Sequence, residues 1–90
     1  MMGGKKVGQL EAVSHIRGVL AQRGINLPSR SIRVRNEENW LVFERGHRSV
    51  GIDPESGVWQ RDSPEADWRC IEKPCTVGGA LMAADFLGQH

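Results

Sequence analysis

The sequence predicts an α+β fold, a single two-layer domain with the element order α-β-β-β-(β)-α. A chain of 90 residues is long enough for one hydrophobic core. Residues 31–60 alternate between apolar and polar side chains in short runs bounded by turn formers, as strands do. A stretch with helical periodicity precedes these runs, and an apolar stretch follows them. We therefore expect an antiparallel meander packed by an N-terminal amphipathic helix and an apolar C-terminal helix.

The first helix is expected from about Val7 to Arg23, because its apolar side chains cover one half of a wheel with helical period. Gly24 suits the left-handed residue of a C-terminal cap, and Ile25 can fold back onto the last turn. The six residues before this helix carry little to bury, so we expect a flexible tail over 1–6 and one domain over 7–90. The apolar half consists of Leu10, Ala12, Val13, Ile16, Val19 and Leu20.

Three strands are expected at 31–35, 40–45 and 48–53. A first turn at 36–39 would place Arg35 opposite Trp40, and a second turn at Gly46 and His47 would place Phe43 opposite Val50. Both hairpins give consistent faces, and a slip by one residue would bury arginines. The predicted core face carries Ile32, Val34, Leu41, Phe43, Val50 and Ile52; the other face carries Arg33, Arg35, Trp40, Val42, Glu44, Ser49 and Gly51.

A fourth strand is expected from Val58 to Gln60, after a turn over 53–57 that has proline at its second position and ends in glycine. A loop of four residues would turn Trp59 toward the core, whereas a loop of three residues with a bulge would turn Val58 there. Residues 62–67 have the capping serine, proline and acids of a short helical turn. Trp68 to Ile71 can add an edge strand.

The last helix, expected from Thr76 to Gly88, is apolar on all sides except for Thr76 and Asp85. Such a helix must be covered on more than one side. The sheet and the first helix can cover about two sides, which leaves room for a second copy of the chain. The residues expected to make this contact are Met82 and Phe86, with Gly79 and Ala83 allowing close approach.

The charge distribution suggests an alternative function in nucleic-acid binding. The formal net charge is +1, but residues 1–35 hold seven basic residues against Glu11. Arg33, Arg35 and Trp40 share a sheet face, and basic and aromatic side chains together can hold phosphates and stack bases. A cross-strand cation–π pair between Arg35 and Trp40 on a solvated face explains the same residues. Arg45 and Arg48 form a small cationic tip at the second turn.

The order of helix, strands and helix is similar to the layout of double-stranded RNA-binding domains. Those domains have a lysine-rich start to the second helix, which grips phosphates. Here the corresponding stretch offers Lys73 and then an apolar helix. The resemblance therefore concerns the order of elements alone.

Catalytic and metal-binding patterns are weak, so we expect neither an enzyme nor a cofactor. The histidines lie far apart, and no serine stands in a nucleophile-elbow context. Cys70 and Cys75 could bind a metal with a histidine or form a redox pair, but a second close pair of ligands is missing. We expect two packed, reduced cysteines, although a helix N-terminus near Cys75 could lower its pKa.

Two function classes follow from these patterns. The favoured one is a non-enzymatic protein-interaction or regulatory module that pairs with itself through the last helix; the alternative is nucleic-acid binding by the arginine face. No apolar run reaches the roughly 20 residues that a membrane helix needs. We therefore expect a cytoplasmic location and no membrane partner. The two cysteines are too few for a disulfide scaffold, which agrees with a reducing compartment.

Overall fold

A computed structural model describes residues 6–53, 55 and 57–89 and confirms the predicted α+β class and element order. The predicted tail lies outside these residues except for Lys6, which forms an antiparallel bridge with Thr76. The described residues contain two helices and one five-stranded antiparallel sheet in the strand order β1-β2-β3-β4-β5. The elements are α1 (Gln9–Gln22), β1 (Arg33–Glu37), β2 (Trp40–Arg45), β3 (Arg48–Asp53), β4 (Gly57–Arg61), β5 (Arg69–Glu72) and α2 (Val77–Gly88).

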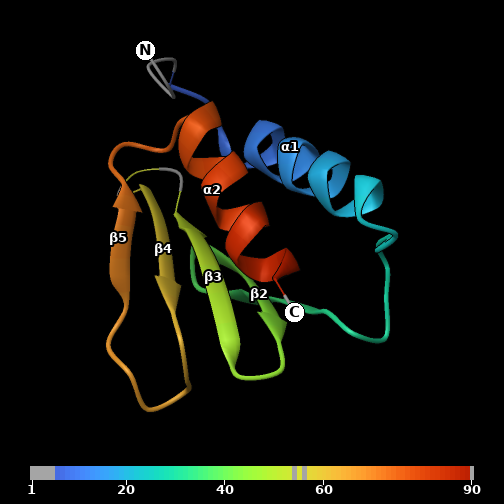
Figure 1. The fold of residues 1–90 in the computed structure, drawn as a ribbon. Coiled ribbons are helices and arrows are strands. Elements are labelled where there is room, and N and C mark those ends of the chain that lie inside the picture. The colour runs from blue at the N-terminus through green and yellow to red at the C-terminus, as the bar shows by residue number, and fades with distance from the viewer. Residues whose placement is uncertain (1–5, 54, 56, 90) are drawn as a thin grey trace.

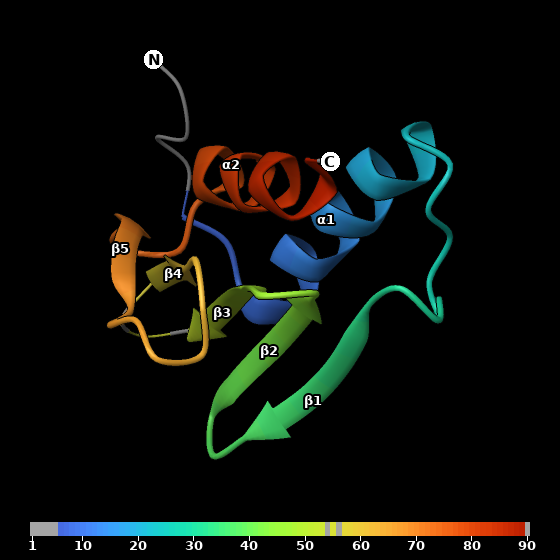
Figure 2. The ribbon, with the colours of Figure 1, turned by 60° about the horizontal axis from the view of Figure 1, so that its bottom comes forward.

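Both helices lie on the same side of the sheet (Figures 1 and 2). In Figure 1, α2 crosses in front of the strands and α1 runs beside it, so the helices cover each other as well as the sheet. The strand β5 forms one edge of the sheet and β1 forms the other. The fold therefore has two layers, and the second face of the sheet is not covered by either helix.

Helix α1 follows the predicted periodicity, with Ala12, Ile16 and Leu20 fully buried one turn apart. It ends as expected: Gly24 has a φ of 82°, and the Ile25 amide donates to the Leu20 carbonyl at 2.9 Å. Leu10, however, is 84% exposed, because it lies at the margin of the apolar half, turned away from the side on which Ala12 and Ile16 are buried.

The hairpin of β2 and β3 has the predicted register, with Phe43 opposite Val50 and Leu41 opposite Ile52. The hairpin of β1 and β2 is shifted by two residues from the prediction, because Glu37 rather than Arg35 lies opposite Trp40. A shift of two keeps every side chain on its predicted face. Val34 faces the helix side but stays exposed, since β1 lies at an edge away from both helices (Figure 2).

The alternative left open for β4 is decided in favour of Val58, which is fully buried in the core. Asp53 pairs with Gly57, so Ile52 lies opposite Val58 and Gly51 opposite Trp59. Gly57 has a φ of 118°, where a side chain would be strained. Trp59 thus lies on the sheet face that the helices leave open.

The remaining connection and edge strand agree with the prediction in outline. Residues 62–66 form a turn, in which the Ala66 amide donates to the Ser63 carbonyl at 3.1 Å. The edge strand β5 begins at Arg69 and pairs with β4, with an irregularity between Val58 and Trp59.

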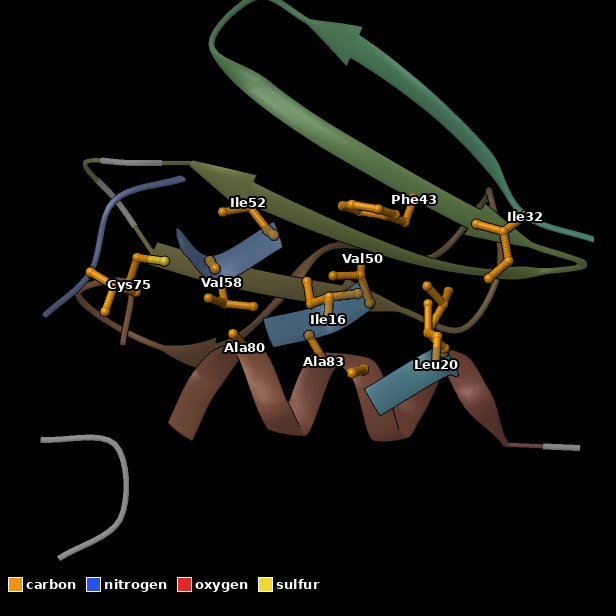
Figure 3. Packing of buried hydrophobic residues seen from close by; sticks show 14 residues of the cluster. Ile16, Leu20, Ile32, Phe43, Val50, Ile52, Val58, Cys75, Ala80 and Ala83 are labelled. Atoms are coloured by element: carbon orange, nitrogen blue, oxygen red, sulfur yellow. The ribbon is translucent and has the colours of Figure 1, made fainter. Parts of the chain in front are cut away.

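The core lies between the sheet and the two helices (Figure 3). Sheet residues such as Phe43, Val50 and Ile52 point toward the helices, where Ile16 of α1 and Ala83 of α2 meet them. Each of these five residues is at most 1% exposed. This packing fixes which side of each helix remains at the surface.

Candidate functional site

The small residues of α2 are used within the domain. Thr76 caps the helix, since its Oγ1 accepts from the Gly79 amide at 3.0 Å. A Cβ at Gly79 would lie 2.7 Å from the Cβ of Glu72 on β5, and Ala83 is fully buried in the core. The small size of Gly79 therefore lets α2 pack closely on β5, and Ala83 packs within the core. Of the four predicted contact residues, Gly79 and Ala83 are not available at the surface.

The outer side of α2 exposes large apolar side chains. Leu81 is 40% exposed and Met82 is 44% exposed, while Phe86, one turn beyond Met82, is half-buried. The two predicted residues Met82 and Phe86 line an open depression of about 430 Å³ beside Gln60 of β4. We call Leu81, Met82 and Phe86 the outer strip of α2.

The C-terminal end of α2 is held by arginines from three other parts of the chain. The Arg48 guanidinium donates to the Phe86 carbonyl at 2.9 Å and also to the Gln89 carbonyl, and Arg45 donates to the Leu87 carbonyl at 3.0 Å. Arg23, the residue that follows α1 as its C-terminal cap, pairs with the Asp85 carboxylate. Cations suit this end of a helix, where carbonyl groups lack partners within the helix.

The five residues predicted for nucleic-acid or anion contact are therefore divided between the two faces of the sheet. Arg45 and Arg48 belong to the helix side, and strand alternation could have shown this, because Arg45 shares its face with Leu41 and Phe43. Arg33, Arg35 and Trp40 lie on the other face, as predicted.

The pair expected between Arg35 and Trp40 is replaced by ion pairs with acids. The Arg35 Nε donates to Glu44 at 3.2 Å, and its Nη1 contacts Glu37. The hydrogen bonds from Glu44 and then Glu37 raise the pKa of Arg35 above its ordinary value. These carboxylates oppose the approach of phosphate groups, so the arrangement does not favour nucleic acid at this face.

The open face of the sheet carries a cluster of the chain's three tryptophans. Trp40 lies 5.9 Å from Trp59 and 5.5 Å from Trp68 between ring centroids. The ring of Trp40 lies over Gly51, where a Cβ would come within 2.7 Å of the Cζ3 atom. We call these three residues the indole cluster.

Strand alternation places Trp40 on this face but does not predict the cluster. Trp68 follows the long connection after β4. Strand alternation does not determine the path of a connection. Gly51, in the centre of the middle strand, could have indicated that another group lies over β3, because a glycine in a strand interior often marks a close approach.

A pocket of about 180 Å³ lies at the end of the indole cluster. Its lining consists of Glu37, Glu38, Trp40, Val42 and Trp68. Glu38 and Asn39 form the tight turn between β1 and β2, and Glu38 has a φ of 57°. The Gln9 side chain of α1 donates to the carbonyls of Asn39 and Ile52, both at 3.0 Å. The turn that carries Glu38 is thus tied to α1 and β3.

The cysteines show no bond to each other, Cys75 being buried and Cys70 exposed. Burial raises the pKa of the Cys75 thiol, which is the opposite of the lowering that a nearby helix N-terminus could have produced. Within the described ranges, no three histidine, cysteine or acidic side chains gather as metal ligands.

No helix in the described part of the chain is both long enough and apolar enough to cross a membrane. Comparisons of the chain with protein-family models, with curated proteins and with solved structures find no match.

Proposed function

We propose that this chain is a small, non-enzymatic protein-interaction module that pairs with a second copy through the outer strip of α2. The observation that carries the proposal is the exposure of Leu81 and Met82, at 40% and 44%, beside the half-buried Phe86 on the last helix. Exposed apolar side chains that neighbour one another on one side of a helix suit a contact with a second copy. The proposal includes the cytoplasmic location expected from the sequence.

A two-fold axis would set the strip against its own copy, because Met82 and Phe86 lie one turn apart on the same side of α2. The small residues of α2 face inward, so the two helices would meet through side chains. Each buried Met or Phe side chain contributes roughly 1.5 to 3 kcal/mol from apolar area. Because association itself costs several kcal/mol, we expect a weak dimer.

Sedimentation equilibrium at tens of micromolar tests this proposal. The wild type should show an average mass well above the 10.0 kDa of one chain. Met82→Glu should reduce the mass to that of a single chain, because two glutamates would face each other at the interface. A mass of one chain for the wild type would refute the proposed pairing.

Leu10→Glu is the matched control, since it also places a charge at an exposed apolar position of a helix. It should leave the mass of the wild type unchanged. If Leu10→Glu and Met82→Glu reduced the mass equally, the contact would not be specific to the outer strip.

A further inference from the structure

The geometry points to a second binding site on the opposite side of the sheet: the pocket lined by Trp40 and Trp68 and bounded by Glu37 and Glu38 takes an organic cation with a quaternary or methylated ammonium group. Such a group occurs in small free compounds and on methylated lysine side chains. Both sources offer the same chemistry, a positive charge spread over an apolar surface. The site does not depend on the pairing of α2.

Two tryptophan rings form aromatic walls of the pocket. The rings of Trp40 and Trp68 are 5.5 Å apart and inclined by 52°, so they form two adjoining walls of the pocket rather than a closed stack. Indole faces are the best aromatic partners for cations, and aromatic pockets are suited to quaternary ammonium groups. Val42 adds an apolar surface that methyl groups can contact.

The cluster already attracts a cation from within the chain. The guanidinium carbon of Arg61 lies 4.4 Å from the centroid of the Trp68 ring. Arg61 is not among the residues that line the pocket, so this internal cation does not fill it. The contact shows that the Trp68 ring takes part in a cation–π interaction.

The acids at the rim supply the charge preference. Glu37 forms an ion pair with Arg35, whereas Glu38 forms no ion pair within the described part of the chain. A negative rim attracts cations and repels carboxylates and phosphates. An unmodified lysine ammonium is strongly hydrated and loses more on entering an apolar pocket, which favours the methylated group.

The pocket is largely formed before a ligand arrives. Gly51 lets the Trp40 ring approach the β3 backbone closely, and the contact with Trp59 supports the ring from β4. Gln9 holds the turn that carries Glu38 at the Asn39 carbonyl. Little ordering is needed on binding, so even a small cation should bind measurably.

A titration with choline tests the site, with 3,3-dimethylbutan-1-ol as the neutral compound of nearly the same shape. Tryptophan fluorescence reports the binding, since every tryptophan of the chain belongs to the indole cluster. We expect choline to bind at least about tenfold more tightly than the neutral compound. Equal affinities, or no saturable change with choline, would overturn the proposal.

Two variants locate the binding, and isothermal titration calorimetry measures them without relying on the indole signal. Glu38→Gln should weaken choline binding by roughly threefold, because it removes the unpaired rim charge. Glu11→Gln is the control, an identical charge change on α1, which lies on the other side of the sheet. Equal affinities for the two variants would contradict a role of the rim.

Trp68→Leu should abolish the preference for choline over the neutral compound, with far-UV circular dichroism confirming that the variant is folded. If that variant is unfolded, the comparison of Glu38→Gln with Glu11→Gln decides the proposal alone.

A final comparison uses peptides that contain trimethyllysine or unmodified lysine. If the methylated peptide binds more tightly than the unmodified one, the natural ligand is a methylated lysine of a protein. If choline binds but neither peptide does, the natural ligand is a small free cation.

Discussion

The two faces of the sheet are built from the same strands but are covered in different ways. On the helix face, β-branched and aromatic side chains such as Phe43, Val50 and Ile52 are buried under two helices. On the indole face, three half-buried tryptophans and the two ion pairs of Arg35 cover the strands without a helix. Strand alternation separates these two sets of residues.

The difference shows how a chain of this length uses its apolar residues. Two short helices suffice to close one face, and indole rings large enough to cover a neighbouring strand replace a third layer on the other. We expect the helix face to contribute most of the stability, because most of the fully buried apolar side chains lie there. The indole face, being less deeply covered, keeps side chains within reach of ligands.

The largest expected effect is the loss of packing on the helix face. Phe43→Ala should lower the free energy of unfolding by about 3 to 5 kcal/mol, because it leaves a cavity in a closed core. Val34→Ala, on the same face but 45% exposed, should cost about 1 kcal/mol or less. Urea denaturation measures both variants. Similar losses would mean that the helices do not close the core as described.

A smaller effect is expected on the indole face. Gly51→Ala should cost about 1 to 3 kcal/mol, because the new methyl group would displace the Trp40 ring. Near-UV circular dichroism should show the altered indole surroundings. Gly18→Ala on α1 is the control: nothing lies within 4 Å of its Cβ position, so helix propensity should stabilise the protein by about 1 kcal/mol. An unchanged stability of Gly51→Ala would contradict the position of Trp40.

The link between the β2–β3 turn and α2 should contribute less. Arg48→Met removes the donors to the Phe86 and Gln89 carbonyls and should cost about 1 to 2 kcal/mol. Arg33→Met removes an exposed arginine of β1 and should change stability by no more than about 0.5 kcal/mol. Amide exchange at the end of α2 should accelerate only in Arg48→Met. Acceleration in both variants would show that the arginines at the turn do not cap the helix.

The smallest effect is the pH dependence that Cys75 contributes. Burial raises its folded pKa above the ordinary thiol value of 9.0, so the stabilising contribution is complete below that pH and is lost as the pH rises through the folded pKa. The slope should be no more than about 1.4 kcal/mol per pH unit. Cys75→Ala should flatten this decline, whereas Cys70→Ala, at an exposed position, should not. The chain has no tyrosine that titrates in the same range.

Much of the fold could be predicted because local patterns determine it. Alternation and the turn at Gly46 and His47 specified the β2–β3 register, and Gly24 specified the end of α1. The β1–β2 register was missed by two residues, because turns of two and four residues give the same faces. The choice between Val58 and Trp59 depended on loop length, for which the sequence carries no local preference.

The candidate sites were less predictable, because they depend on how distant elements meet. The rotation of α2 could not be read from a helix that is apolar on all sides, so Gly79 and Ala83 were assigned to the surface together with Met82 and Phe86. The roles of Arg45 and Arg48 depend on where the end of α2 lies. The indole cluster depends on the path of residues 62–68 across the open face.

The most direct test of the division between the faces is an amide and indole proton–nitrogen NMR spectrum recorded over a wide range of protein concentrations. Pairing through the outer strip predicts that dilution shifts the signals of Leu81, Met82 and Phe86. The indole signals of Trp40, Trp59 and Trp68 should stay in place, because they lie on the other face of the sheet. Shifts of the indole signals with an unchanged α2 would contradict the account and place the self-contact on the indole face.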